Sequence, residues 1–118
     1  MLVYLLRMYS PNPLTPAVFH ILLAIADGEK HGYAIMQEVS KLSGSKFRMG
    51  PGTLYTTIQR LLDLKLIAET KDSIAEEGRR RYYKLTRAGK SLFEAELARM
   101  DDVLRLAHRK NKCPRFST

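Results

Sequence analysis

Basic and polar side chains concentrate in the middle of this 118-residue sequence, and they are the groups best suited to binding a ligand. Residues 41–90 contain twelve Lys or Arg and five Asp or Glu, a net charge of +7, and the whole chain carries +8. Lysine and arginine bind polyanions because neutralising phosphates releases condensed counterions. The charge distribution therefore predicts a polyanionic partner, with nucleic acid as the first candidate.

The groups that would carry catalysis do not occur in a useful pattern. No nucleophile stands with a base and an orienting group, and no glycine-rich phosphate loop is present. The single cysteine, Cys113, excludes an internal disulfide and a cysteine-rich zinc site. His20 has no second ligand spaced to join it, and we interpret His31 as a helix-start residue. We therefore predict no enzymatic activity, no metal site and no cofactor.

Two helices are expected to support the basic segment from its N-terminal side. The first should follow Thr15, a favourable N-cap, with Pro16 in the first turn and a stop at Asp27-Gly28. Its residues are apolar nearly all round, which indicates burial. The second helix should run over about residues 32–42, where apolar residues repeat at helical spacing.

A third helix should open at Gly50-Pro51 and end at about Leu64. Its two sides differ. Helical spacing places one set on the core side: Leu54, Ile58, Leu61, Leu62 and Lys65. The opposite side carries Thr53, Thr56, Arg60 and Asp63, with Gln59 at its edge and Tyr55 between the two sides. The polar side can donate to phosphates or read bases, and the small residues at the helix start leave backbone amides open to a phosphate.

Two strands are expected next, over about residues 66–71 and 80–86, with a hairpin loop between them. The second strand and its approach carry Arg79, Arg80, Arg81 and Lys84. Such a cluster can contact the DNA backbone or enter a narrow minor groove. The alternative is a solvated hairpin whose charges keep the sheet edge from pairing with other chains.

The last helix is expected from about residue 86 to 108. A seam with spacings of four, three, four and three is formed by Phe93, Leu97, Met100, Leu104 and Ala107. The seam predicts a homodimer; the alternative is that it covers the core of its own chain. The basic tail, residues 109–118, is expected to be disordered.

The N-terminal extension, residues 1–13, is too short to span a bilayer and lacks the features of a signal peptide, which predicts a cytoplasmic protein. Either Met1 or Met8 can be the natural start. The whole pattern predicts a mainly α winged helix-turn-helix: residues 14–86 form a three-helix core with a two-stranded β wing, and residues 87–108 form a dimerisation helix. This fold predicts a DNA-binding regulator. The alternative is an oligomerisation module whose basic charge is incidental.

Several short motifs occur together in a characteristic order, and on them the sequence resembles the PadR family of transcriptional regulators. The matching pieces are Leu14-Thr15-Pro16, His31-Gly32-Tyr33, Pro51-Gly52-Thr53-Leu54-Tyr55, Leu66-Ile67, and Arg81-Tyr82-Tyr83-Lys84-Leu85-Thr86 with Gly89. The resemblance implies a winged-helix dimer, usually a repressor, that binds operator DNA by its third helix and wing. It also implies that Tyr55 contacts DNA.

The resemblance further implies a small aromatic or drug-like effector, since some relatives are released by such molecules bound between the subunits. The chain departs from those relatives in having no tryptophan, where some carry an aromatic residue on the dimer helix; Met100 is our choice for that position. Met100 and Phe93 can still line an apolar pocket.

Overall fold

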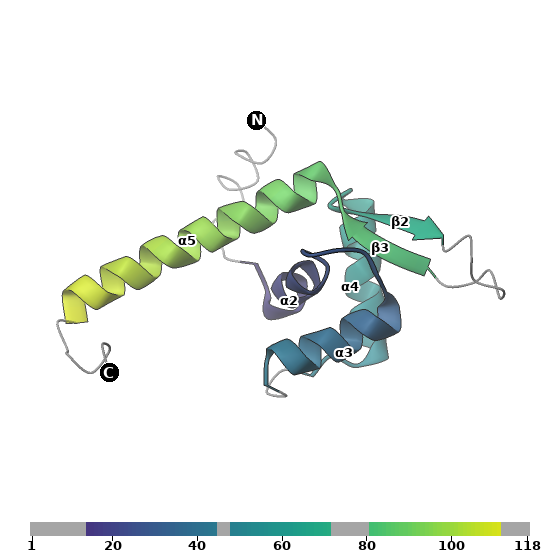
Figure 1. The fold of residues 1–118 in the computed structure, drawn as a ribbon, viewed down its shortest axis with the longest axis horizontal. Coiled ribbons are helices and arrows are strands. Elements are labelled where there is room, and N and C mark those ends of the chain that lie inside the picture. Colours follow the sequence, from purple (N-terminus) through teal and green to yellow (C-terminus); the bar gives the residue numbers. More distant parts are fainter. Residues whose placement is uncertain (1–13, 45–47, 72–80, 112–118) are drawn as a thin grey trace.

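The computed structural model describes residues 14–44, 48–71 and 81–111. Seven elements follow one another along the chain, as Figure 1 shows: α2 (Pro16–Ala24), β1 (Lys30–His31), α3 (Gly32–Leu42), α4 (Pro51–Asp63), β2 (Ile67–Lys71), β3 (Arg81–Leu85) and α5 (Arg87–Asn111). The prediction of a mainly α winged helix-turn-helix is confirmed. Residues 1–13, the hairpin loop and most of the basic tail lie outside the described residues.

The helix starts follow local chemistry that the sequence predicts. The Thr15 side chain accepts a hydrogen bond from the Val18 amide, and Pro16 occupies the first turn of α2. His31 acts in the same way for α3, because its Nδ1 accepts from the Ala34 amide at 3.2 Å. The interpretation of His31 as a helix-start residue is therefore confirmed. Helix α2 ends at Ala24, earlier than expected, and the following turn carries an ion pair of 2.7 Å between Lys30 and Asp27.

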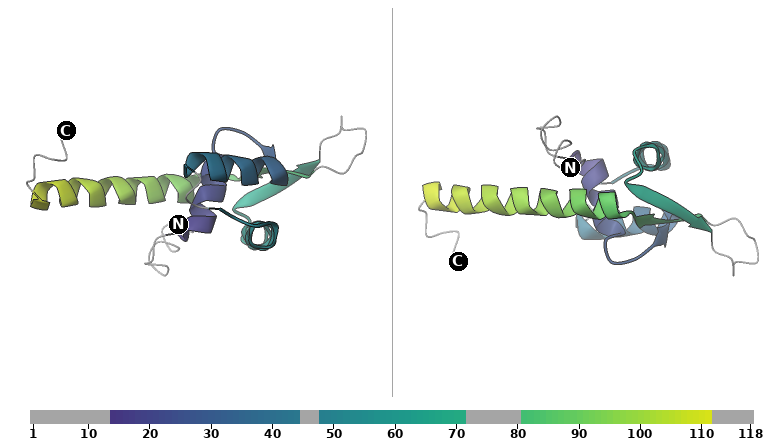
Figure 2. Two further views of the ribbon diagram at one scale, coloured as in Figure 1. Left: turned by 90° about the horizontal axis from the view of Figure 1, so that it is seen from below. Right: turned by 90° about the horizontal axis from the view of Figure 1, so that it is seen from above.

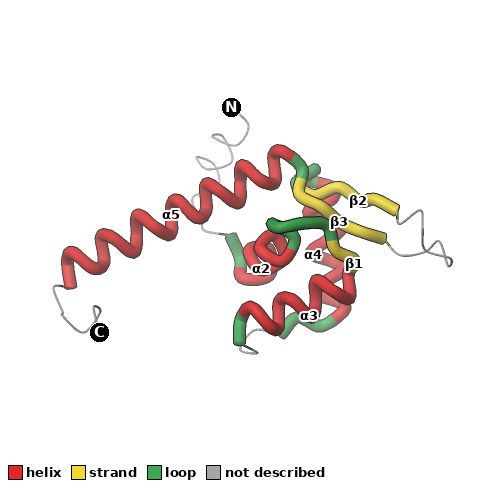
Figure 3. Tube along the Cα trace, in the orientation of Figure 1, coloured by secondary structure: helices red, strands yellow, loops and turns green. Residues whose placement is uncertain are grey.

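The predicted two-stranded wing is corrected to a three-stranded antiparallel sheet in the order β1-β3-β2. Strand β1 adds only two residues, with Lys30 opposite Tyr83 and His31 opposite Tyr82. Figure 3 shows β1 at the edge of the sheet, directly before α3. Two residues are too few to show the alternation that identifies a strand in a sequence. The consequence is that the wing is hydrogen-bonded to the segment between α2 and α3.

One core joins the three short helices to the sheet. Its largest fully buried side chains come from the three helices and the residue that follows α2: Ile21, Leu22, Ile25, Ile35, Leu54, Leu61 and Val39. Tyr83 and Ile67 extend the core onto the sheet, and Phe93 extends it onto α5. Lys65 was predicted on the core side of the third helix, but it lies beyond the end of α4 and is exposed, with a left-handed backbone (φ 61°). That conformation turns the chain from α4 into β2.

Helix α5 leaves the domain as a straight rod, which Figure 2 shows from two sides. Its first turn is fixed by Thr86, whose hydroxyl donates to the Lys65 carbonyl (2.8 Å) and accepts from the Gly89 amide (3.0 Å). A Cβ on Gly89 would stand 1.9 Å from the Leu66 carbonyl oxygen, so only glycine permits this approach. Helix α5 continues to Asn111, and the tail predicted to begin at residue 109 is helical over its first three residues.

Candidate nucleic-acid interface

The outer side of α4 is free of the rest of the chain. Leu54, Ile58 and Leu61 point into the core, as their spacing predicts. The side chains predicted on the opposite side are all exposed, including the one at its edge: Thr53, Thr56, Arg60 and Asp63, with Gln59. The N-cap is Gly50, which has no side chain to cap the helix. A Cβ on Gly50 or Gly52 would meet nothing within 4 Å. Helix α4 therefore offers a polar side and a small, uncovered N-terminus to a partner.

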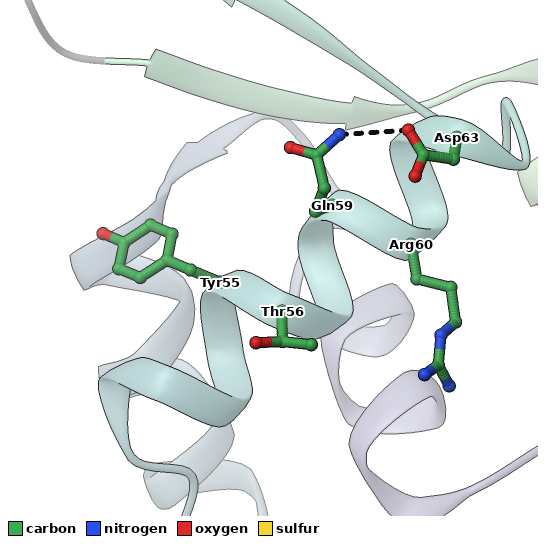
Figure 4. Close-up of a pocket in the computed structure, with 5 residues that line it drawn as sticks. All are labelled: Tyr55, Thr56, Gln59, Arg60 and Asp63. Atoms are coloured by element: carbon green, nitrogen blue, oxygen red, sulfur yellow. Dashed lines mark hydrogen bonds between the residues drawn. The ribbon is translucent and has the colours of Figure 1, made fainter.

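The polar side of α4 forms a shallow, open depression, shown in Figure 4. Its lining is Tyr55, Thr56, Gln59, Arg60 and Asp63. The Gln59 amide nitrogen donates to Asp63 Oδ1 at 3.0 Å, whereas the Arg60 guanidinium points away from that pair. No ion pair involves Arg60 among the residues that the structure describes. Its charge is therefore available to an incoming anion.

Tyr55 is placed by contact with the next helix rather than by helix geometry alone. It is 51% exposed, and a Cβ on Gly32 would stand 2.6 Å from its hydroxyl oxygen. The Tyr55 ring therefore lies against the first residue of α3, where only a glycine leaves room for it. Helical spacing alone places Tyr55 between the two sides of α4, and the contact with Gly32 comes from the tertiary fold.

The wing contributes less to the described interface than the sequence predicts. Arg81 is exposed and pairs with Glu69 at 3.5 Å. Burial raises the pKa of Tyr83, which shares a sheet face with Arg81, and the Glu69 carboxylate adds to the effect. Arg79 and Arg80 lie outside the described residues. Their role therefore stays a prediction.

Lys84 is separated from the polar side of α4. Side chains alternate along a strand, so Lys84 and Arg81 project from opposite faces of β3. Lys84 lines a different hollow together with the turn after α2 and the start of α5, to which Asp27, Glu29, Arg87 and Lys90 also contribute. The structure does not bring Lys84 together with Thr56 and Arg60, so its predicted contact with DNA gains no support.

The predicted dimer seam divides into two parts on α5. Phe93 is 7% exposed and stacks on Phe19, with ring centroids 5.7 Å apart. Phe93 therefore belongs to the core of its own chain. For this residue the alternative interpretation, in which the seam covers the core rather than a partner, is the correct one. The rest of the seam is exposed: Leu97, Met100, Leu104 and Ala107, with Val103 and Leu106 exposed beside it.

Glu96 is a buried carboxylate for which the sequence predicts no role. Its carboxylate accepts hydrogen bonds from Nε and Nη2 of Arg99, both at 2.9 Å, and from the Leu14 amide at 3.3 Å. This pairing raises the pKa of Arg99. Because Leu14 precedes α2, Glu96 ties the start of the domain to α5. Glutamate at one position of a charged helix gives no sequence signal of such a contact.

The described residues contain no grouping of three or more His, Cys, Asp or Glu side chains that could hold a metal ion. None of the helices described is both long and apolar enough to cross a membrane.

Three short helices, a sheet that extends beside α4, and an uncovered polar side on α4 define a winged helix-turn-helix domain of the DNA-binding type. The sequence profile of the PadR-like family of transcriptional regulators matches residues 21–95, well over half of the chain. The chain belongs to this family. The family is one of transcriptional regulators, and its domain occupies residues 21–95 of this chain.

Two relatives illustrate the sequence match. The chain is 34% identical over 87 residues to the transcriptional regulator Rv3488 of Mycobacterium tuberculosis, covering 73% of this chain and 77% of that protein. It is 42% identical over 76 residues to an uncharacterized 37.1 kDa protein in a transposon of Streptomyces fradiae, covering 64% of this chain. The match spans only 20% of the length of that transposon protein.

Solved structures share the fold. A PadR family regulator from Clostridium difficile has a TM-score of 0.68 at 23% identity, over 80% of this chain and 97% of its own. Bacillus subtilis PadR in complex with operator DNA has a TM-score of 0.64 at 22% identity, over 73% of this chain and 48% of its own. Bordetella bronchiseptica BpsR, whose DNA binding is regulated by 6-hydroxynicotinic acid, has a TM-score of 0.62 at 22% identity, over 80% of this chain and 65% of its own.

Proposed function

We propose that this protein is a homodimeric repressor that binds operator DNA with the polar side of α4 and with the wing. The observation that carries the proposal is the exposure of Thr56 and Arg60 on α4. A helix of this kind fits the major groove, which is about 12 Å wide. The Arg60 guanidinium, with no ion-pair partner among the described residues, is available for a phosphate or a guanine.

The exposed apolar side chains of α5 support the homodimer. Leu97 is 42% exposed and Leu104 is 54% exposed, and Met100 lies between them. A contiguous apolar stripe of this kind marks an interaction surface. Pairing two α5 helices about a two-fold axis would cover the stripe, and the proposal requires this pairing to present both α4 helices to one side of a duplex. Two-fold symmetric dimers of this class recognise half-sites one helical turn apart, so we expect a spacing of about 34 Å.

A small apolar effector bound beside α5 is the remaining part of the proposal. Met100 is unbranched and polarisable, so it suits a site that adapts to a flat ligand. The regulation of BpsR by 6-hydroxynicotinic acid supports this part at the level of a shared fold. An effector that binds the free dimer better than the DNA-bound dimer would release the operator by linkage.

Gel-shift titration against the DNA upstream of the protein's own gene tests the proposal, with an unrelated duplex as competitor. Arg60→Ala should weaken operator binding by roughly tenfold, because one contact to a phosphate or a base is lost. Arg87→Ala is the matched control, since it removes the same charge from an exposed position on α5. Equal affinity of the parent and Arg60→Ala would contradict the assignment of α4 as the DNA-binding helix.

The same titration with small aromatic carboxylic acids and amides tests the effector. Release of the operator at micromolar ligand, with Met100→Ala less sensitive than the parent, is the expected result. Equal release of the operator from the parent and from Met100→Ala would show that Met100 is not part of the effector site.

A further inference from the structure

The acidic residue at the end of α4 stands in an unfavourable place. Asp63 is the last residue of the helix, where the partial negative charge of the helix end repels a carboxylate. It also lines the surface proposed to receive DNA, where its charge repels phosphates. The hydrogen bond between Gln59 and Asp63, which lie four residues apart on the helix, offsets part of this repulsion, but affinity for a polyanion does not explain an aspartate at this position. A role in selecting among DNA sequences does.

The contact that Asp63 makes determines the orientation of Gln59. A carboxylate accepts hydrogen bonds and donates none, so the nitrogen side of the Gln59 amide must face Asp63. The amide oxygen and the second N–H remain available. Figure 4 shows the pair on the same side of α4 as Tyr55 and Thr56, with Arg60 turned away from it.

Adenine offers a donor and an acceptor side by side in the major groove, and a glutamine amide matches both at once. An amide free to flip could equally meet a phosphate or another base. In water the Gln59–Asp63 hydrogen bond contributes little, because it is exposed. It strengthens when DNA excludes water from the depression.

We propose that Asp63 is a specificity-determining positioning residue, which holds the Gln59 amide in the orientation that reads adenine. The inference rests on the proposed function, since it requires α4 in the major groove. Asp63 also penalises binding to DNA in which no adenine meets Gln59, because its charge then approaches phosphates without compensation.

Selection of binding sites from a randomised duplex library by the full-length protein tests the proposal. Four proteins are compared: the parent, Gln59→Ala, Asp63→Asn and the double variant. We expect the parent to prefer adenine at one position of each half-site. Gln59→Ala should lower that preference by roughly five- to a hundredfold, the range of one bidentate base contact. Asp63→Asn, whose amide can either accept from or donate to Gln59, should lower it by a smaller factor, and the double variant should match Gln59→Ala.

Affinity for a duplex of arbitrary sequence should move in the opposite direction. Asp63→Asn should bind it several-fold more tightly, because a charge that repels phosphates is gone. The thermal midpoint should stay unchanged or rise, which a merely structural role would not allow. Asp102→Asn is the matched control, because it makes the same change at an exposed position on α5.

Three outcomes would overturn the proposal. The first is an adenine preference that is unchanged in Asp63→Asn, and the second is a lost cytosine preference, which would mean that Asp63 reads a base directly. The third is a lower thermal midpoint together with loss of all DNA binding, which would make Asp63 a structural residue. Failure of the proposed function is distinct, because the parent itself would then select no sequence from the library.

Discussion

The outer side of α4 and the second half of α5 are both exposed, but they expose opposite kinds of side chain. On α4 the exposed groups are hydroxyl, amide and guanidinium, which water solvates well. On α5, from Leu97 onward, large aliphatic side chains stand in water: Leu97, Met100, Val103, Leu104 and Leu106. A polar surface is stable in water without a partner, so it suits reversible binding. An apolar surface suits a permanent partner, because each methylene that is buried stabilises the complex by about 0.8 kcal/mol.

The largest effect should come from charging the apolar stripe of α5. Leu97→Lys with Leu104→Lys places four ammonium groups in the proposed interface, and we expect the subunit dissociation constant to rise at least about a hundredfold. Light scattering should then report a monomer. Ala98→Lys with Asp102→Lys adds positive charge to the opposite side of the same helix and should leave the dimer intact. A dimer that survives in the Leu97/Leu104 variant would place the interface elsewhere.

The first half of α5 behaves as part of the domain, and Gly89 is the position that tests this. A Cβ there would stand 1.9 Å from the Leu66 carbonyl oxygen, which is backbone and cannot turn aside. Gly89→Ala should therefore destabilise the fold by about 3 kcal/mol. Its thermal midpoint should fall by more than about 10 °C.

Gly52→Ala is the matched control for that experiment. Gly52 also lies near the start of a helix, but a Cβ there meets open space. Alanine should be neutral or stabilising at this position, because it restricts the unfolded chain. Equal thermal midpoints for the two variants would show that α5 can shift away from Leu66, and that its first half is no more firmly held than its second.

The sequence predicts the elements whose signals are local and repeated. Thr15, Pro16 and Pro51 give the helix starts, and the spacing of Leu54, Ile58 and Leu61 separates the two sides of α4. It does not predict contacts between distant segments. The pairing of β1 with β3, the bond from Leu14 to Glu96 and the seat of Tyr55 on Gly32 depend on the tertiary fold. Phe93 fits the heptad spacing and the core equally well, so only the structure separates the two.

The polar side of α4 should be sensitive to a change that removes no DNA-contacting group. In Gly32→Ala the new methyl group displaces the Tyr55 ring, whose hydroxyl oxygen would otherwise stand 2.6 Å away. The ring can rotate outward, so stability should change little. Affinity for operator DNA should fall roughly five- to tenfold if Tyr55 contacts it, equivalent to about 1 kcal/mol.

A double-mutant cycle with Tyr55→Ala isolates this effect. In the Tyr55→Ala background, Gly32→Ala should have no further influence on operator affinity, because no ring remains to be displaced. An undiminished loss in that background would mean that Gly32 acts through the backbone of α3. The first turn of α3 would then belong to the DNA interface together with the polar side of α4.

The smallest effect is expected where α4 ends. Lys65 adopts a left-handed backbone (φ 61°), a conformation that costs a residue with a Cβ about 1 kcal/mol. Lys65→Gly should relieve this strain and raise the free energy of unfolding by up to about 1 kcal/mol, offset in part by the greater freedom of glycine in the unfolded chain. Urea unfolding measures the change, and Lys65→Ala, which keeps the Cβ, should show no gain. Operator affinity should fall only slightly, by the loss of one exposed charge, because the turn at Lys65 lies beyond the polar side of α4. A large loss of affinity in Lys65→Gly, with Lys65→Ala unaffected, would instead show that the strained turn sets the angle between α4 and the wing.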